Sequence, residues 1–199
     1  MNCLVVAAHP LPDSLCMTLT DRVVAQLKDA GHTVVLEDLC AAKFDPCLSA
    51  AERTSYYSPA YDAARVAEQV EQLLAAEAVV LLFPTWWFGF PAVLKGWFDR
   101  VWAPGIAYDH ARDFGPIKSR LNNLERMLVV TTLGAPWWVD RLIMRQPVKK
   151  VLKIALLSTC APGCKFEMLS LYKAENLPPA RVDRFTLRIE KRLARWPRV

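Results

Sequence analysis

Residues 78–91, which read AVVLLFPTWWFGFP, contain the strongest fold signal in the chain. Six successive apolar residues, 78–83, are typical of a strand that is buried on both faces, as in a parallel sheet covered by helices. Four aromatic residues follow within positions 86–90. Pro91 suits the first turn of a helix, where its missing N–H group would have no partner. The stretch therefore predicts a strand, an aromatic loop and a helix in succession.

The same alternation of strands and helices extends from this stretch in both directions. The five expected strands are residues 2–8, 33–38, 78–83, 126–132 and 164–172. Helices are expected where apolar residues recur every three or four positions, as at 14–30, 91–102 and 182–196. Gly31 is expected to end the first helix. This order predicts parallel strands joined by right-handed crossovers, in an open α/β sheet with helices on both faces.

Two capping features and one proline define shorter helical pieces. Ser49 and Glu52 have the spacing of a capping box and predict a short helix in the connection after the second strand. Pro147 is expected to split the helical region that follows the fourth strand into two pieces. These features refine the helix boundaries without changing the fold class.

The composition is that of a folded chain. Of the 199 residues, 53% are hydrophobic and 23% are charged, and the mean hydropathy is +0.15, which excludes an intrinsically disordered protein. The length suits a single domain over residues 1–199. No run approaches the ~20 apolar residues of a membrane-spanning helix. The first residues also lack a basic segment and a small-residue cleavage site, so we expect a cytoplasmic protein.

The cysteine, histidine and glycine contents argue against several kinds of site. The six cysteines lie in apolar segments of a chain large enough to fold without disulfides, so reduced thiols are expected. Cysteine and histidine are not clustered as zinc ligands are, and no metal site is expected. The seven glycines form neither G-x-G-x-x-G nor G-x-x-x-x-G-K-[ST]. This disfavours the Rossmann dinucleotide fold and the P-loop NTPases.

Charge is distributed unevenly along the chain. Residues 1–140 contain 11 Lys and Arg against 16 Asp and Glu, a net charge of −5, whereas residues 141–199 contain 14 against 4, a net charge of +10. The basic excess lies on the face of a helix, without interleaved aromatic residues or a nucleic-acid recognition module, so no nucleic-acid partner is expected. A solvated helix face explains the excess best, followed by a phosphorylated cosubstrate or a protein partner.

Three loops are expected at one edge of the sheet, because ligands of open parallel sheets bind beyond the carboxyl ends of the strands. The first, residues 9–14 (HPLPDS), ends at Ser14, which either caps the helix or helps to hold a phosphate at the helix N-terminus. The second is the aromatic loop 84–91, whose rings suit stacking on a planar ligand. The third, residues 131–138 (TTLGAPWW), adds hydroxyl groups, N–H groups and two indoles. Together they predict a pocket for a ligand like flavin mononucleotide.

Four segments carry a family pattern: HPLPDSL (9–15), FDPCLSAAE (44–52), FPTWWFGFPAVLKGWFDRVWAPGIAY (83–108) and TTLGAP (131–136). They resemble the flavodoxin-like NAD(P)H quinone oxidoreductases, and the third segment is highly specific. The resemblance implies a flavodoxin-like five-stranded sheet of order 2-1-3-4-5. It also implies FMN or FAD as the bound flavin, NAD(P)H as cosubstrate, and a homodimer in which the partner covers the active site.

The resemblance also assigns site residues by position. The residues that would hold the phosphate and ribityl chain are His9, Ser14, Leu15 and Cys16; those at the isoalloxazine ring are Thr85, Trp86, Trp87 and Phe88; those at its pyrimidine end are Thr131, Thr132, Leu133 and Gly134. Tyr108 would face the substrate. The departures from the family pattern are Cys16 in place of Asn, Leu133 in place of Gly, and Val139 and Arg145 in place of the Tyr and His that assist hydride transfer in mammalian quinone reductases. The group that supplies protons is therefore not identified.

The expected function is the transfer of two electrons from NAD(P)H through the flavin to a quinone or a similar acceptor, since the protein would supply orientation and a dry planar slot to the cofactor. A one-electron carrier of the flavodoxin type is one alternative. Another is a regulatory flavoprotein subunit of a transport system, docked through its basic C-terminal third. A homodimer is also expected because residues 91–102 and 137–142 contain more large apolar surface than one side of a sheet can cover.

Overall fold

A parallel sheet of five strands forms the centre of the computed structural model, which describes all residues except 59, 111–116 and 198–199. The strands are β1 (Asn2–Ala7), β2 (Thr33–Asp38), β3 (Ala78–Pro84), β6 (Arg126–Leu133) and β7 (Lys165–Tyr172). Their order is β2-β1-β3-β6-β7, and every neighbouring pair is parallel. The expected five strands and the order 2-1-3-4-5 are confirmed.

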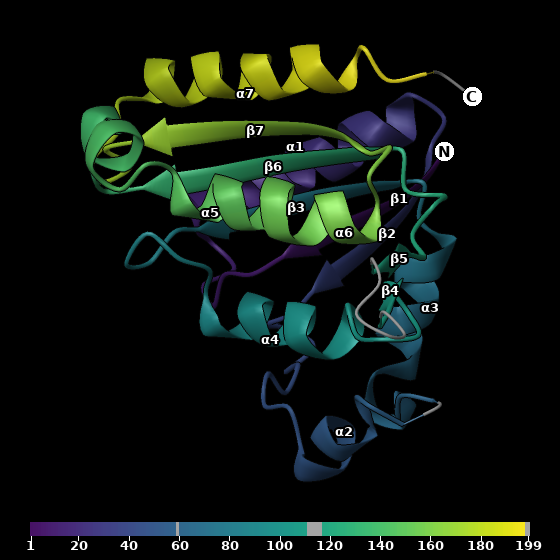
Figure 1. The fold of residues 1–199 in the computed structure, drawn as a ribbon. Helices are drawn as coiled ribbons and strands as arrows, with labels where there is room; N and C mark the ends of the chain where they lie inside the picture. Colours follow the sequence, from purple (N-terminus) through teal and green to yellow (C-terminus); the bar gives the residue numbers. More distant parts are fainter. Residues whose placement is uncertain (59, 111–116, 198–199) are drawn as a thin grey trace.

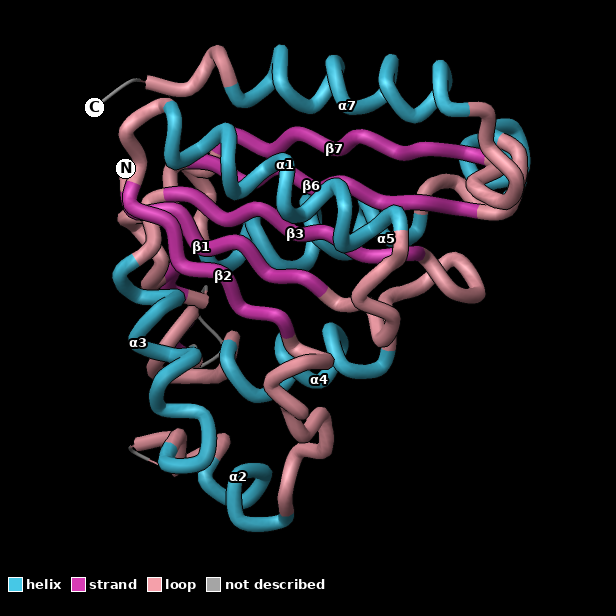
Figure 2. The backbone as a smooth tube through the Cα atoms, turned by 180° about the vertical axis from the view of Figure 1, so that it is seen from behind, coloured by secondary structure: helices cyan, strands magenta, loops and turns pink. Residues whose placement is uncertain are grey.

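Helices cover both faces of this sheet, as Figures 1 and 2 show. They are α1 (Leu15–Asp29), α2 (Ala50–Ser55), α3 (Ala67–Ala75), α4 (Ala92–Val101), α5 (Pro147–Lys150), α6 (Ser158–Cys160) and α7 (Pro179–Leu193). A 3-10 turn, η1 (Ala64–Val66), and two π-helical turns, η2 (Val139–Ile143) and η3 (Val151–Leu157), complete the helical segments. A short hairpin of β4 (Tyr108–Asp109) and β5 (Lys118–Ser119), which the sequence pattern does not predict, lies outside the sheet.

The alternating side chains of the strands separate two apolar cores. On one face, α1 and α7 pack together over residues such as Val80 and Leu128. On the other face, α3, α4 and the α5–α6 region pack over residues such as Val79 and Val129. No helix in the described part of the chain is long and apolar enough to cross a membrane.

The caps expected from the sequence are present. Ser14 accepts a hydrogen bond from the Met17 amide at 3.3 Å, and Ser49 and Glu52 form the capping box that begins α2. Gly31 has the left-handed backbone, with φ +85°, that a residue after a helix often needs. Main-chain groups at a helix end have no partner within the helix. The serine and glutamate side chains bind such groups, and Gly31 turns the chain away from the helix axis.

The apolar face of α4 is buried within the chain itself. Leu94, Trp97 and Val101 are fully buried, and the Trp97 ring packs edge-on to those of Phe98 and Trp102 at 5.2 and 6.2 Å. The expectation that residues 91–102 expose apolar surface to a second chain is therefore wrong. The sequence offered no sign that the connection after β2 folds under this helix and covers it.

A buried ion pair holds this connection against α4. The Arg100 Nε donates to Glu52 Oε1 at 2.8 Å, and both side chains are 2% exposed. Arg100 also donates to the carbonyl of Asp45. Close by, Gly96 faces the backbone of Pro46, where a Cβ atom on residue 96 would overlap it. The long connection is thus fixed to the helix that follows the aromatic loop.

Candidate functional site

The three loops that follow β1, β3 and β6 meet at the carboxyl edge of the sheet. The Thr85 amide donates to the carbonyl of Thr132 at 2.9 Å, and the Thr85 hydroxyl reaches the same oxygen at 3.2 Å. The rings of His9 and Trp86 lie 6.5 Å apart. These contacts join the second loop to both of the others, and they confirm that the three loops converge.

A hollow of about 330 Å³ opens between the second and third loops. Its walls are formed by Pro84, Thr85, Trp86, Trp87, Thr132, Leu133, Gly134, Ala174 and Glu175. Six of these were expected at the flavin from the sequence. Ala174 and Glu175 were missed, because they follow β7 in a stretch without aromatic or glycine-rich character; the only available signal was their place after a fifth parallel strand.

The aromatic loop has a constrained backbone and exposed rings. Trp87 and Phe88 have φ angles of +52° and +57°, a left-handed conformation that is costly for bulky residues and that concentrates at functional sites. The Gly89 amide closes the turn by donating to the Trp86 carbonyl at 2.9 Å. The Trp87 side chain is 99% exposed. An indole held outward in this way presents a free face to a ligand or to a second chain.

The loop after β1 ends in main-chain donors. The amides of Leu15 and Cys16 belong to the first turn of α1 and have no acceptor in the described part of the chain. His9 Nδ1 lies 3.1 Å from the Leu11 amide nitrogen and 3.3 Å from the Leu11 carbonyl oxygen, so the ring is held against the loop. Burial raises the pKa of the Cys16 thiol to about 12, so this residue offers its amide and not a thiolate.

The loop after β6 combines a buried hydroxyl with a close backbone approach. Thr131 is fully buried and its hydroxyl has no hydrogen-bond partner in the described structure, while Leu133 is buried in the core. A Cβ atom on Gly134 would lie 2.8 Å from Glu175 Oε1, so glycine leaves room for that carboxylate. The amide of Gly134 has no acceptor among the described residues. The donor set of this edge therefore consists mostly of main-chain N–H groups.

Tyr108 lies away from this edge of the sheet. It belongs to β4, which Figure 1 places toward the amino-terminal ends of the strands. Its ring packs edge-on to that of His110 at 5.5 Å, and His110 stacks on Tyr57 at 4.9 Å. Burial raises the pKa of the Tyr108 hydroxyl. Within one chain this residue does not line the hollow at the carboxyl edge, and its contact with substrate stays a prediction.

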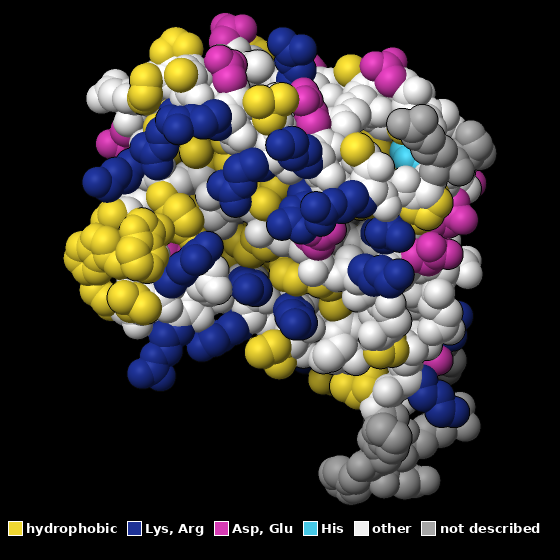
Figure 3. Space-filling model, turned by 90° about the horizontal axis from the view of Figure 1, so that it is seen from above, with side chains coloured by type: hydrophobic (Ala, Val, Ile, Leu, Met, Phe, Trp, Pro, Cys, Tyr) yellow, Lys and Arg dark blue, Asp and Glu magenta, His cyan; other side chains and the backbone are white. Residues whose placement is uncertain are grey.

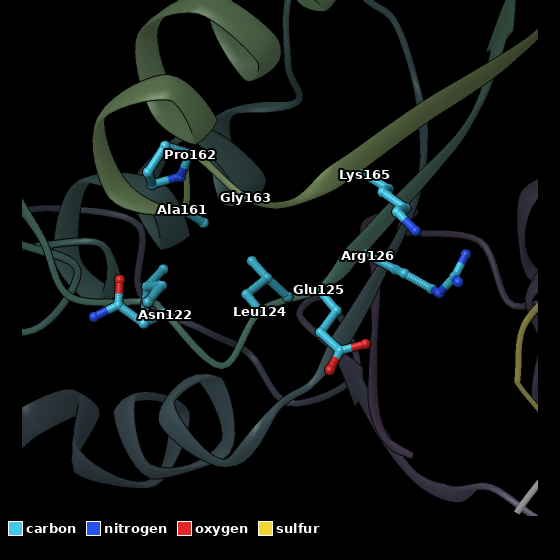
Figure 4. Close-up of a pocket in the computed structure, with 9 residues that line it drawn as sticks. Asn122, Leu124, Glu125, Arg126, Ala161, Pro162, Gly163 and Lys165 are labelled. Atoms are coloured by element: carbon cyan, nitrogen blue, oxygen red, sulfur yellow. The ribbon is translucent and has the colours of Figure 1, made fainter.

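Another hollow, of about 380 Å³, lies at the amino-terminal ends of β6 and β7. Figure 4 shows Arg126 and Lys165 extending side by side on one side of it, away from Pro162 and Asn122. Ligands of open parallel sheets bind at the opposite ends of the strands. This hollow is therefore not the candidate site.

Known proteins share this fold. A family model described as "Flavodoxin-like fold" matches residues 1–193. The chain belongs to this family. It is 37% identical, over 151 residues, to NAD(P)H dehydrogenase [quinone] 1 of Rattus norvegicus, a match that covers 66% of the chain and 53% of the relative. The chain therefore matches about half the length of that relative.

Two solved structures have the same fold at lower identity. The NAD(P)H:quinone oxidoreductase from Methanothermobacter marburgensis has a TM-score of 0.81 and 24% identity, covering 96% of this chain and 93% of its own. An FMN-dependent NADH-azoreductase from Bacillus anthracis str. Ames Ancestor, in complex with FMN, has a TM-score of 0.74 and 17% identity, covering 98% and 99%. These two similarities support the fold. The activity has to be argued from the residues of the site.

Proposed function

We propose that this flavodoxin-like protein is a flavin-dependent NAD(P)H oxidoreductase that passes two electrons to a quinone or a similar acceptor. The observation that carries the proposal is the meeting of three loops at one sheet edge, joined by the hydrogen bonds from Thr85 to Thr132 and by the contact of His9 with Trp86. One loop offers amides at a helix N-terminus and the others offer aromatic faces. The names of the rat relative and the M. marburgensis structure agree with this reading.

The residues present fit a flavin. The free amides of Leu15 and Cys16, with the helix dipole behind them, suit a phosphate. Because no lysine or arginine stands between His9 and Cys16, N–H and hydroxyl donors would hold it. Residues 85–88 and 131–134 would hold the ring system. The flavin, when bound, accepts hydride and releases electrons to the acceptor. We assign FMN, which the B. anthracis azoreductase contains, with FAD as the alternative.

Proton supply at this site differs from the mammalian pattern. Val139 has no titratable group, and arginine does not serve as a proton donor at neutral pH. Arg145 is exposed and has a left-handed backbone, with φ +56°. Charge that develops at the pyrimidine end of the ring would therefore be met by main-chain amides such as that of Gly134, which are fixed dipoles and do not titrate.

A homodimer accompanies this function in our proposal. Exposed apolar side chains follow one another in residues 138–144: Trp138, Leu142, Ile143 and Met144 are 40–65% exposed. Figure 3 shows a large hydrophobic area on one side of the molecule. An apolar cluster of this kind on a folded chain is typical of an interaction surface. A second copy would cover it and could bring its Tyr108 to the site. Light scattering at micromolar concentration should give twice the chain mass, and Leu142→Glu should shift the mass toward the monomer.

Purification tests the proposal directly. The protein should be yellow, should bleach on addition of NADPH without oxygen, and should recolour with a quinone. Ser14→Glu should abolish flavin binding, because a carboxylate would occupy the phosphate position and repel the dianion. Ser14→Asn, which retains a good helix cap, is the control for folding. Full flavin occupancy in the Ser14→Glu variant would contradict the placement.

A further inference from the structure

A hollow of about 440 Å³ lies along the free edge of β7, beside the candidate flavin site. It is lined by Trp137, Arg141, Gln146, Lys149, Met168, Ser170, Tyr172 and Arg188. The three residues from β7 alternate along the strand and therefore share one face. The three cations come from separate elements, η2, α5 and α7. Positive groups from three separate elements thus converge on one space.

The positive charge of this hollow is not neutralised by its neighbours. Arg141, Lys149 and Arg188 form no ion pair within the described residues, and no carboxylate lines the space. Two acidic residues that adjoin lining residues in the sequence have partners of their own: Asp140 accepts a hydrogen bond from the Tyr172 hydroxyl at 2.8 Å, and Glu167 pairs with Arg192 at 2.8 Å. Figure 3 shows Lys and Arg spread over this face of the molecule. The hollow therefore favours an anion.

Contacts of the lining residues position the walls of the hollow. The Arg141 guanidinium lies 6.0 Å from the centre of the Tyr172 ring, a distance at which a cation is attracted to an aromatic face. The turn between η2 and α5 has two successive left-handed residues, Arg145 and Gln146, at φ +56° and +53°. The Gln146 amide holds this turn by donating to the Asp140 carbonyl at 2.8 Å. Strained backbone of this kind is typical of ligand sites.

The shape and chemistry suit a nucleotide. The volume falls within the range of small-ligand pockets. Three cations and the Ser170 hydroxyl match a phosphomonoester dianion, for which arginine provides paired donors. Trp137 is 52% exposed and offers a flat face on which a purine can stack. We propose that this hollow binds a phosphoadenosine group.

Two sources of that group are distinguishable. One is a free nucleotide. The other is the 2′-phosphoadenosine end of NADPH, and this second assignment rests on the proposed function. The hollow adjoins the flavin site through two hydrogen-bonded turns, in which Lys173 donates to the Ala135 carbonyl at 3.2 Å and Ala174 to that of Leu133 at 2.8 Å. A dinucleotide could therefore reach from one space to the other across these turns.

Calorimetry with adenosine 2′,5′-bisphosphate at low salt tests the proposal without flavin or turnover, so it can fail or succeed independently of the proposed function. We expect binding in the micromolar range, weakened at least about tenfold by Arg188→Glu. Arg195→Glu, seven residues further along the chain, beyond the end of α7 and outside the hollow, makes the same change in net charge and should leave the affinity within about twofold. An unchanged affinity in Arg188→Glu, or equal losses in both variants, would overturn the proposal.

Two comparisons then identify the source. If the group belongs to NADPH, adenosine 5′-monophosphate should bind more weakly than the bisphosphate, and Arg188→Glu should lower the ratio of kcat/KM for NADPH to that for NADH about tenfold. If a free nucleotide is the ligand, both adenosine phosphates should bind in the hollow and the ratio should not move. Binding of poly-glutamate with no binding of either nucleotide would show a protein-docking surface and contradict the proposal.

Discussion

Replacing Arg100 with methionine should destabilise the chain strongly, although the residue lies outside the candidate site. The substitution keeps an apolar chain of similar length on α4 and removes the guanidinium that Glu52 and the Asp45 carbonyl contact. Among the described residues, the donor that then remains to the buried Glu52 carboxylate is the Ser49 amide, at 2.7 Å. A buried charge without its partner lowers the stability of the folded chain strongly.

The expected loss follows from this burial. Removing one partner of a buried ion pair costs about 3–5 kcal/mol. For a domain of this length, this lowers Tm by roughly 6–20 °C. The matched control is Lys95→Met on the same helix, where Lys95 pairs with Asp99 at 2.6 Å but the side chains are 56% and 43% exposed. Exposed pairs contribute about 0–1 kcal/mol, so this variant should lose at most a few degrees.

Thermal unfolding of a double variant separates the pair from general packing. Glu52→Leu should also destabilise, but combining it with Arg100→Met should cost less than the sum of the single changes, because no buried charge then remains. The pKa of Glu52 is also informative: burial raises it, but the Ser49 amide and Arg100 more than offset this and hold it below the usual range. Its contribution is therefore present above about pH 4.5 and is lost as the pH falls. A Tm for Arg100→Met within 2 °C of the parent, or additive effects, would refute the reasoning.

Three further outcomes are expected. Burial raises the pKa of Glu37 to about 7, so the folded chain retains a proton that the unfolded chain releases from about pH 4.5 upward, and stability falls as the pH rises between these values. Glu37→Gln should therefore raise the free energy of unfolding more at pH 8 than at pH 5, by on the order of 2–3 kcal/mol, and equal gains at both pH values would contradict the assignment. Gly96→Ala should lower the free energy of unfolding by about 1–3 kcal/mol or more, because the new Cβ atom would meet the backbone of Pro46. Gly134→Ala should lower it by less than about 1 kcal/mol, because the new Cβ atom would meet the end of the Glu175 side chain. Urea unfolding compares the two variants, and the reverse order would be inconsistent with the packing. Stopped-flow reduction of the flavin by NADPH should vary little between about pH 6 and 8, since Val139 and Arg145 cannot titrate there; a sigmoid centred near pH 6.5 would instead indicate a histidine.

The fold and the edge of the site could be inferred from sequence because they depend on local signals. Continuous apolar runs predict buried parallel strands, and the order of elements then places the loops after β1, β3 and β6 together. The partners of Arg100 and Glu37 could not be inferred. Arg100 meets Glu52 from 48 positions away, and Glu37 accepts from the Trp97 indole across 60 positions. Such pairs produce no periodic pattern in the sequence, and neither does the approach of Glu175 to Gly134.

The hydrogen bonds between Thr85 and Thr132 limit the width of the slot that we propose for the flavin. Both residues continue neighbouring strands, in which Pro84 lies opposite Thr132, and the separation of hydrogen-bonded strands is close to 4.8 Å in all sheets. The spacing of the sheet thus fixes the distance between the two main-chain segments that border the slot, and this distance can change little. Under the proposed function, descendants of this protein would change their acceptor by exchanging the rings at Trp86 and Trp87 while the gap between the strands stays constant.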